Sequence, residues 1–330
     1  MAHWIEPHPT GIYVRPADAW IDPSLPQERA LVTHGHADHA RGGHGHVWAT
    51  RETLAIMGLR YGTASGTAVD YGEEVRLGGV RIRYVPAGHV LGSAQILLEH
   101  AGERVVVTGD YKRRPDPTCL PFEPVPCDIF VTEATFGLPV FRHPDTGSEM
   151  DRLLAALHAN PDRCVLVGAY ALGKAQRVIS ELRGRGHHDA IYIHGALERM
   201  CALYQEFGVD LGELRPATGV PAKEMRGHII LSPPSALNDR WSRRLPEPIT
   251  AMASGWMRVR QRARQKNVEL PLVISDHADW DELTDTIREV APSETWITHG
   301  REEALLHWCM THQIRARALA LVGREDEVEG

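Results

Sequence analysis

One short segment near the N-terminus constrains this 330-residue chain more than any other. It reads Leu31-Val-Thr-His34-Gly-His36-Ala-Asp38-His39, so three histidines and an aspartate follow an apolar run directly. The apolar run predicts a strand, and the polar residues then occupy a tight loop at its end. Such a loop can aim alternate side chains at one metal ion and the others at a second. Since histidine and aspartate ligate Zn²⁺ in catalytic sites, the segment predicts a metal centre.

The same order, a strand followed by a ligand-type side chain, occurs at four later places in the chain. Val85-Pro-Ala-Gly leads to His89, and Val105-Val-Val-Thr-Gly leads to Asp110, whose carboxylate can bridge two ions. Val273-Ile-Ser-Asp leads to His277, and Trp296-Ile-Thr leads to His299. The chain holds 19 histidines in all, and the spacing of these few, rather than the total, indicates the metal ligands.

Composition excludes several classes of protein. The net charge of −7 argues against a surface that binds polyanions everywhere, although a local basic groove remains compatible with it. The five cysteines are an odd number without a C-x-x-C pair, which argues against a disulfide framework and favours a reducing cytoplasm. No apolar run approaches the roughly 18–20 residues that span a bilayer, and the start of the sequence lacks a secretory signal pattern. We therefore expect a cytoplasmic protein with no membrane partner.

Hydrophobic patterning divides the chain into regions with different expected secondary structure. The first half predicts short strands and one helix, over residues 11–14, 30–33, 51–60 (the helix), 80–85, 94–98, 104–108 and 129–132. Beyond residue 146, helices at 150–159, 173–183 and 197–207 alternate with strands at 164–168, 190–193 and 228–231, which predicts a parallel sheet. The last elements expected are strands at 249–254, 272–275 and 295–298, and helices at 281–290 and 302–314. Pro139–Gly147 and the Arg/Gln-rich stretch Arg258–Asn267 are the expected boundaries of an inserted domain.

Taken together, these motifs resemble the metallo-β-lactamase fold, and more specifically its β-CASP nucleic-acid-processing branch. The resemblance starts with H-x-H-x-D-H, His89 and Asp110, and covers about residues 10 to 315. It continues with Glu133 in Val-Thr-Glu-Ala-Thr-Phe-Gly, His277 in Ser-Asp-His-Ala-Asp and His299 in Thr-His-Gly. Within the branch, Gly109-Asp-Tyr-Lys-Arg-Arg-Pro-Asp116 is most similar to bacterial ligase-associated DNA exonucleases.

The resemblance implies an α/β fold, an αββα metallo-β-lactamase sandwich with an inserted α/β β-CASP domain. Residues 1–140 and 267–330 would form the sandwich, and residues 141–266 the insertion. It also implies two divalent metal ions, Zn²⁺ or Mn²⁺. His34, His36 and His89 would hold the first ion, and Asp38, His39 and His299 the second. Asp110 would bridge the two ions, and Asp22 would contact a metal-binding side chain without contacting an ion itself.

The implied chemistry is phosphodiester hydrolysis, with Asp38, Glu133 and His277 as the catalytic side chains. Glu133 would orient the imidazole of His277 and favour its protonated form, so that His277 can give a proton to the leaving oxygen. Positive charge would hold the substrate. The residues expected to contact it are Lys112, Arg113, Lys174 and Ser275, the last at a terminal phosphate.

The leading function is a DNA exonuclease that acts in repair beside a DNA ligase and a helicase. An RNA-processing β-CASP nuclease, similar to those that form messenger-RNA 3′ ends, remains the alternative because both would use the same catalytic residues. A small-molecule hydrolase of the wider fold is a third class, against which His277, His299 and the inserted region argue. The motifs leave the substrate open between DNA and RNA.

Overall fold

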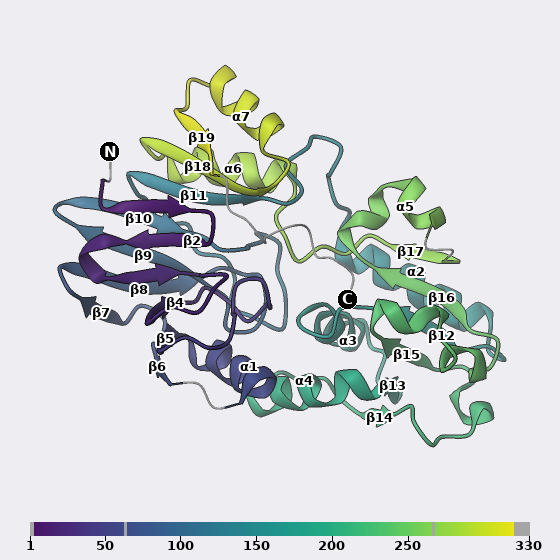
Figure 1. Ribbon diagram of the computed structural model, residues 1–330. Coiled ribbons are helices and arrows are strands. Elements are labelled where there is room, and N and C mark those ends of the chain that lie inside the picture. Colours follow the sequence, from purple (N-terminus) through teal and green to yellow (C-terminus); the bar gives the residue numbers. More distant parts are fainter. Residues whose placement is uncertain (1–2, 63–64, 266–267, 320–330) are drawn as a thin grey trace. The chain divides into compact units, whose positions relative to one another are not determined.

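The computed structural model describes residues 3–62, 65–265 and 268–319, which divide into two compact units (Figure 1). The first unit combines the chain up to Arg142 with the segment that starts at His277. The second unit runs from His143 to Asp276. The expected domain boundary between residues 266 and 267 falls outside the described residues. Within the described ranges, no helix is both long enough and apolar enough to cross a membrane.

The first unit contains two sheets. One has six strands in sequence order, of which the first three pair antiparallel and the rest parallel: β1 (Ile5–His8), β2 (Gly11–Val14), β3 (Ala19–Ile21), β4 (Arg29–Leu31), β5 (His46–Ala49) and β6 (Gly66–Ala68). The other has the order β19-β18-β11-β10-β9-β8-β7. Its strands are β7 (Glu74–Leu77), β8 (Val80–Pro86), β9 (Ala94–His100), β10 (Glu103–Val107), β11 (Ile129–Ala134), β18 (Glu294–Gly300) and β19 (Ala316–Ala318).

Three helices cover the outer faces of these sheets: α1 (Arg51–Tyr61), α6 (Trp280–Val290) and α7 (Glu302–Thr311). Ile21 and Leu31 of the first sheet share a buried core with Ile96 and Val105 of the second, so the sheets pack face to face. On the opposite side of the second sheet, residues of α6 and α7 pack on its strands, and the buried members include Leu97, Val106, Phe130, Leu283, Ile287 and Leu305. Met57 of α1 packs on the other face of the first sheet. The layers therefore run helix, sheet, sheet, helix.

Strand β9 shows why the second sheet needs cover on both faces. Six of its seven residues are buried, and Ile96 and Leu98 point into the core between the sheets. Leu97 points the other way, into the core under the helices. The centre of the strand, Ile96-Leu97-Leu98, is accordingly apolar on both faces, with Gln95 and Glu99 on either side of it.

The second unit is an α/β layer built on a six-stranded sheet in the order β14-β13-β15-β12-β16-β17, in which every pairing is parallel. The strands are β12 (Val165–Gly168), β13 (Ile191–Ile193), β14 (Leu214–Pro216), β15 (Ile229–Ser232), β16 (Ile249–Ala253) and β17 (Leu270–Leu272). Its helices are α2 (Thr146–Ala159), α3 (Lys174–Gly184), α4 (Gly195–Glu206) and α5 (Arg260–Gln265). The mixed α/β class and the parallel sheet expected from the alternation of elements are confirmed.

One expected strand is displaced. Residues 272–275 were expected to extend, but β17 ends at Leu272. The Val273 N–H donates to a carboxylate oxygen of Glu149 at 2.8 Å, so it leaves the ladder of the sheet. A side chain on a distant helix thus ends the strand, and the local sequence carries no sign of that partner.

Glu99 of β9 lies among three arginines on the second sheet. Its carboxylate is 2.7 Å from Arg104 Nε, 3.0 Å from an amino nitrogen of Arg83 and 3.3 Å from one of Arg81. Burial would raise the pKa of Glu99, but the hydrogen bonds and charges of these arginines outweigh it and hold the pKa below its usual value. The charged form is therefore the stabilising one.

We predict that Glu99→Gln lowers the free energy of unfolding by about 1 kcal/mol at pH 7, as partly exposed ion pairs do. Because the folded pKa is depressed, this stability is present above the unfolded pKa of about 4.3 and is lost as pH falls through the folded value. Urea unfolding at pH 7 and near pH 3 checks this. The exposed Arg51–Asp70 pair gives the control, Asp70→Asn, which should change little at either pH. An equal loss for Glu99→Gln at both pH values would contradict the account.

Candidate active site

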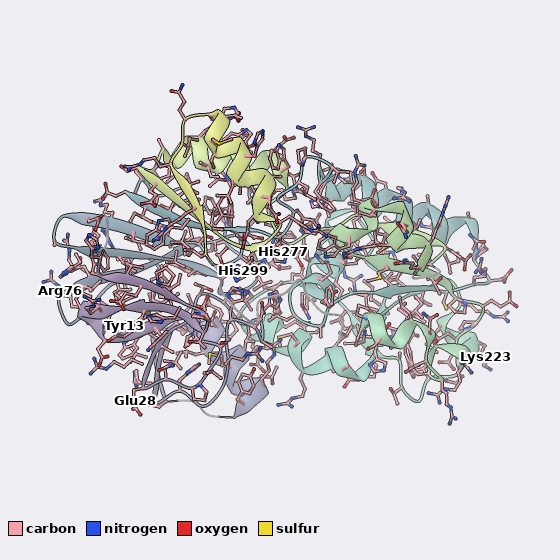
Figure 2. All side chains as sticks on the ribbon, turned by 45° about the horizontal axis from the view of Figure 1, so that its top comes forward. Tyr13, Glu28, Arg76, Lys223, His277 and His299 are labelled. Atoms are coloured by element: carbon pink, nitrogen blue, oxygen red, sulfur yellow. The ribbon has the colours of Figure 1, made fainter. Side chains whose placement is uncertain are left out.

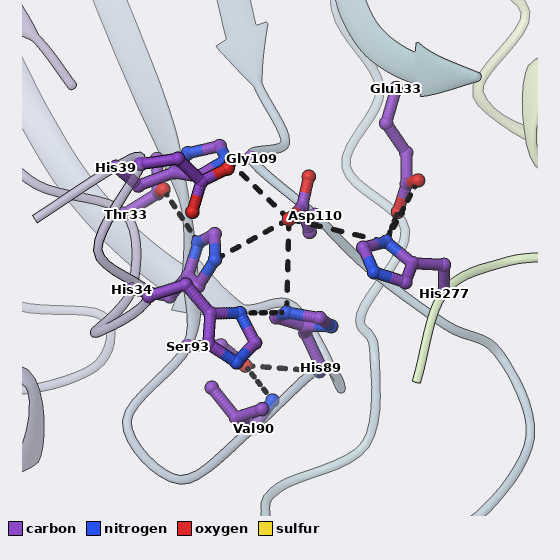
Figure 3. Close-up of polar contacts among 12 residues, drawn as sticks. Thr33, His34, His39, His89, Val90, Ser93, Gly109, Asp110, Glu133 and His277 are labelled. Carbon is purple, nitrogen blue, oxygen red and sulfur yellow. Dashed lines mark hydrogen bonds and ion pairs between the residues drawn. The ribbon is translucent and has the colours of Figure 1, made fainter. Parts of the chain in front are cut away.

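Asp110, which follows β10, lies at the centre of a cluster of histidines in the first unit (Figure 3). Its Oδ2 is 3.4 Å from Nε2 of His34 and 3.4 Å from Nε2 of His39. The same oxygen is 3.8 Å from Nε2 of His89 and 4.0 Å from Nδ1 of His277. The loop after β4, the loop after β8, the end of β10 and the segment before α6 thus converge on one carboxylate.

Three groups of side chains bring ligand atoms within 4.8 Å of one another. The first contains His34, His36, His89 and Asp110; the second contains His39, Asp110 and His299; the third contains Asp110, Glu133 and His277. Asp110 belongs to all three groups. Six of the seven side chains that the sequence assigned to metal binding are therefore in these groups. The seventh, Asp38, stands outside them, with its Oδ2 3.4 Å from Nε2 of His39.

The donor chemistry of this cluster fits divalent metal ions. The side chains of His34, His39 and His89 are almost fully buried, and the Nε2 of His34 makes no hydrogen bond within the described part of the chain. The Nε2 of His89 lies 2.9 Å from the Nδ1 of His36, so two imidazoles turn nitrogen atoms toward each other. A buried nitrogen without a hydrogen bond costs free energy, and a cation bound between His34 Nε2 and Asp110 would satisfy it.

Burial and neighbouring charges set the protonation of the cluster. Burial, followed by the charge of His39, lowers the pKa of His34 to about 4. Burial, with the nearby His34 and His277, also lowers the pKa of His89 far below its usual value. Burial would raise the pKa of Asp110, but His39 and His34 outweigh it and hold that pKa well below its usual range. At neutral pH, His34 and His89 are therefore uncharged imidazoles beside the anionic carboxylate of Asp110. The uncharged imidazole is the form of histidine that binds metal ions.

Asp22 holds His39 from behind. One of its oxygens accepts hydrogen bonds from His39 Nδ1 at 2.8 Å and from the Thr33 hydroxyl at 2.6 Å, and the other accepts from the Thr33 N–H at 2.8 Å. Asp22 has a φ of 44°, in the left-handed region that aspartate tolerates better than most residues. The Asp22 bond fixes the ring so that Nε2 of His39 faces Asp110. Sequence reasoning named Asp22 but missed Thr33, whose one signal is its place directly before His34.

Glycines precede two of these side chains because a positive φ and close neighbours leave no room for a Cβ. Gly88 has a φ of 73°, and a Cβ there would lie 2.6 Å from the carbonyl oxygen of Lys112. Gly109 has a φ of 58°, and its Cβ would lie 2.6 Å from the hydroxyl of Thr33. The loop after Gly88 is closed by Ser93, whose hydroxyl accepts from the N–H groups of His89 and Val90. Ser93 was not predicted, although its place in Gly-His-Val-Leu-Gly-Ser is a local signal for such a turn.

His299 reaches the cluster through an irregularity in the sheet. The pairing of β11 with β18 shifts register between Thr132 and Ala134, and His299 has a φ of 59°. Bulges of this kind re-aim side chains beside active sites. The Nδ1 of His299 lies 3.9 Å from Oδ1 of Asp110, and Figure 2 shows His299 next to His277 in the first unit. No pattern in the sequence announces the bulge.

Glu133 and His277 form a buried pair beside Asp110. The Nδ1 of His277 is 3.1 and 3.2 Å from the two carboxylate oxygens of Glu133, and the Tyr111 N–H donates to one of them at 2.8 Å. Burial raises the pKa of Glu133, and the charge of His277 acts against this shift. The carboxylate thus occupies one ring nitrogen of His277 and fixes the direction of the other.

The residues expected to contact substrate are engaged inside the protein. Lys112 is fully buried, pairs with Asp116 at 2.8 Å and donates to the carbonyl oxygen of His89, so the structure gives it a role in holding that loop. Arg113 lies 2.7 Å from a carboxylate oxygen of Glu289. These partners are set by the fold, and a basic run in a sequence does not reveal them.

The two residues expected to contact substrate from the second unit are also buried. Lys174, at the start of α3, pairs with Asp276 at 2.7 Å. The carbonyl oxygen of Ser275 accepts a hydrogen bond from Arg177, and Arg177 lies 3.1 Å from Asp276. Within this unit, Lys174 and Arg177 therefore neutralise Asp276.

No family model matches the chain. A probable DNA ligase of Opitutus terrae is 28% identical over 317 residues, which are 91% of this chain and 30% of that protein. Cleavage and polyadenylation specificity factor subunit 3 of Dictyostelium discoideum is 24% identical over 90% of this chain and 49% of its own length. Endoribonuclease YSH1 of Mycosarcoma maydis is 29% identical over 62% of this chain and 28% of its own length. The chain thus spans about half or less of each relative.

This chain is similar to the β-CASP nucleases of the metallo-β-lactamase fold. The resemblance predicted from the motifs is thereby confirmed, and the β-CASP relatives imply the metallo-β-lactamase fold. A crystal structure of a protein of unknown function from Enterococcus faecalis has a TM-score of 0.53 and 14% identity, over 81% of this chain and 74% of that one. That likeness concerns the fold alone.

We predict that Asp22→Asn weakens metal binding about 10- to 100-fold, because an amide holds His39 less firmly than a carboxylate does. Competition against a chromogenic chelator measures the affinity. Asp18 provides a matched control, since it also has a left-handed backbone but is exposed and accepts a hydrogen bond from the Tyr13 hydroxyl. Asp18→Asn should leave the affinity unchanged. Equal affinities for Asp22→Asn and the wild type would show that Asp22 does not act through a metal ligand.

Proposed function

We propose that this protein is a metal-dependent nuclease that degrades DNA from its ends in DNA repair, with two Zn²⁺ ions at the Asp110 cluster. The observation that carries the proposal is the Glu133–His277 pair. The Nδ1 of His277 lies 4.0 Å from Oδ2 of Asp110, the residue that belongs to all three groups of possible metal ligands. An acid beside a two-metal cluster suits the hydrolysis of a phosphodiester, whose leaving oxygen needs a proton. The second unit corresponds in this proposal to the inserted β-CASP domain.

The proposed ligands divide around Asp110. His34, His36 and His89 would hold one ion, Asp38, His39 and His299 would hold the other, and Asp110 would bridge them. Divalent ions bound there would supply positive charge that neutralises a phosphate and lowers the pKa of water. Mn²⁺ suits the same nitrogen and oxygen donors, so it is an alternative to Zn²⁺.

His277 serves in this proposal as the proton donor. Its Nδ1 is occupied by the Glu133 carboxylate, so Nε2 is the atom that gives a proton to the leaving oxygen. A negative charge on Glu133 favours the protonated imidazole. The Tyr111 N–H holds that carboxylate in place at 2.8 Å.

DNA is the proposed substrate because the relative that covers 91% of this chain is named a probable DNA ligase. A ligase and a helicase of the same repair pathway are the proposed partners, and a cytoplasmic location accompanies them. RNA processing is the second candidate function. It is favoured by the similarity to an endoribonuclease and to a cleavage and polyadenylation factor subunit that covers 90% of this chain.

End-labelled DNA and RNA, single- and double-stranded, with 5′-phosphate or 5′-hydroxyl ends, test the substrate directly. We expect progressive shortening of DNA from its ends in the presence of Zn²⁺ or Mn²⁺, and no cleavage by Asp110→Asn. Activity should fall steeply with salt, since phosphate contacts release counterions. Cleavage of RNA alone would favour the second function. Hydrolysis of small esters or β-lactams, with no cleavage of any nucleic acid, would refute both.

Alanine substitutions of His299 and His277 should have different effects on metal binding and on the rate of hydrolysis. His299→Ala should lose bound metal and all hydrolysis, whereas His277→Ala should keep its metal and lose roughly 10²–10⁴-fold in rate, the range of a general acid. A nitrophenyl phosphodiester needs little protonation of its leaving group, so it should rescue His277→Ala but not His299→Ala. Glu133→Gln should resemble a milder His277→Ala. Metal loss in His277→Ala together with full occupancy in His299→Ala would reverse the two roles.

A further inference from the structure

The segment that carries His277 is a loop, yet the side chain is almost fully buried. Residues 273–279 form neither helix nor strand, and His277 is 6% exposed. The Ala278 N–H donates to the carbonyl oxygen of Tyr111 at 2.6 Å, and Asp279 begins α6 in a reciprocal capping pair with Glu282. The backbone position of His277 therefore depends on how firmly the start of α6 is held.

Arg114 holds the start of α6. One amino nitrogen of its guanidinium lies 2.8 Å from Oδ2 of Asp279, and its Nε lies 3.1 Å from Oε1 of Glu282. The Arg114 N–H donates to the same Glu282 oxygen at 2.9 Å. The Arg114 side chain is only 17% exposed, so its charge is shared between two carboxylates of the protein.

Arg114 also belongs to the segment that places the partner of His277. Tyr111, three residues earlier, donates its N–H to Glu133 and accepts the Ala278 N–H at its carbonyl oxygen. Asp110 begins the same segment. Residues 110–114 thus fix the carboxylate that orients the imidazole and the backbone on which the imidazole is carried.

We propose that Arg114 is a positioning residue for His277, and that it sets the direction in which His277 gives up its proton. This inference rests on the proposed nuclease function. The competing interpretation follows from the basic run Lys112–Arg114, in which Arg114 would contact a phosphate of the substrate.

The two interpretations differ in what lysine can replace. A lysine keeps the positive charge that attracts a phosphate, but it lacks the planar fork that reaches Asp279 and Glu282 from two different nitrogens. If Arg114 positions His277, Arg114→Lys should be impaired nearly as much as Arg114→Gln. If Arg114 contacts substrate, the lysine should retain most of the activity.

The test compares Arg114→Gln, Arg114→Lys and Asp279→Asn on DNA and on a nitrophenyl phosphodiester. We expect kcat on DNA to fall about 10- to 100-fold in both Arg114 variants, as misplaced catalytic groups do. KM, metal content and the salt dependence should stay unchanged, and the nitrophenyl substrate should lose far less. Asp279→Asn keeps a good helix N-cap and removes the negative charge that Arg114 contacts, so this variant provides the test if Arg114→Gln folds poorly. We expect Asp279→Asn to show the same DNA-selective loss.

The exposed pair of Arg142 with Asp281 of the same helix supplies the control, and Arg142→Gln should leave both rates unchanged. In the background of His277→Ala, Arg114→Gln should cause no further loss of activity, because the effects of residues that act through one group are not additive.

Restored activity in Arg114→Lys with a raised KM in Arg114→Gln would make Arg114 a substrate contact. A further, additive loss in the double variant would also overturn the proposal. A wild type that hydrolyses neither substrate would refute the nuclease function, whereas an active wild type with fully active Arg114 variants would refute only the positioning role.

Discussion

The carboxylate of Asp110 is the group around which this site is organised. It lies within 4.0 Å of ring nitrogens of His34, His39, His89, His277 and His299, which come from four separate segments of the chain. A buried carboxylate is unfavourable unless positive charge or hydrogen-bond donors surround it. The layered sheets of the first unit meet that requirement by ending several strands at one place. The fold and the chemistry therefore depend on the same convergence.

Support for the cluster comes from uncharged groups as much as from charged ones. Asp22 and Thr33 fix one side of the first loop, and Ser93 closes the turn that presents His89. Lys112 is buried against the carbonyl oxygen of His89 and adds charge-assisted bonding there. The three basic side chains of Gly-Asp-Tyr-Lys-Arg-Arg after β10 thus each meet a carboxylate of the first unit, and Arg113 remains partly exposed.

Much of the fold was predictable because its signals are local. The apolar run before His34 and the alternation of helices and strands beyond residue 146 are both short-range patterns. The ligand-type residues were identified for the same reason, since an apolar run precedes each of them in the sequence. Short edge strands such as β6 and β14 were missed because three residues carry almost no periodicity.

The remaining features depend on partners distant in sequence. Glu149 ends β17 from another helix, and Glu289 neutralises Arg113 from 176 positions away in the chain. The register shift before Ala134 that brings His299 to Asp110 is a property of two paired strands, so neither strand shows it by itself. Such features follow from tertiary packing and cannot be assigned from a motif.

The central proposal is that two metal ions would be held by histidines on the two sides of Asp110, which would contact both ions. Anomalous diffraction at a zinc or manganese edge, from crystals of the full chain grown with that ion, tests it most directly. The account predicts two peaks about 3.5–4 Å apart, one among His34, His36 and His89 and the other between His39 and His299, with Asp110 contacting both. A single peak, or an ion bound by Glu133 and His277, would contradict it.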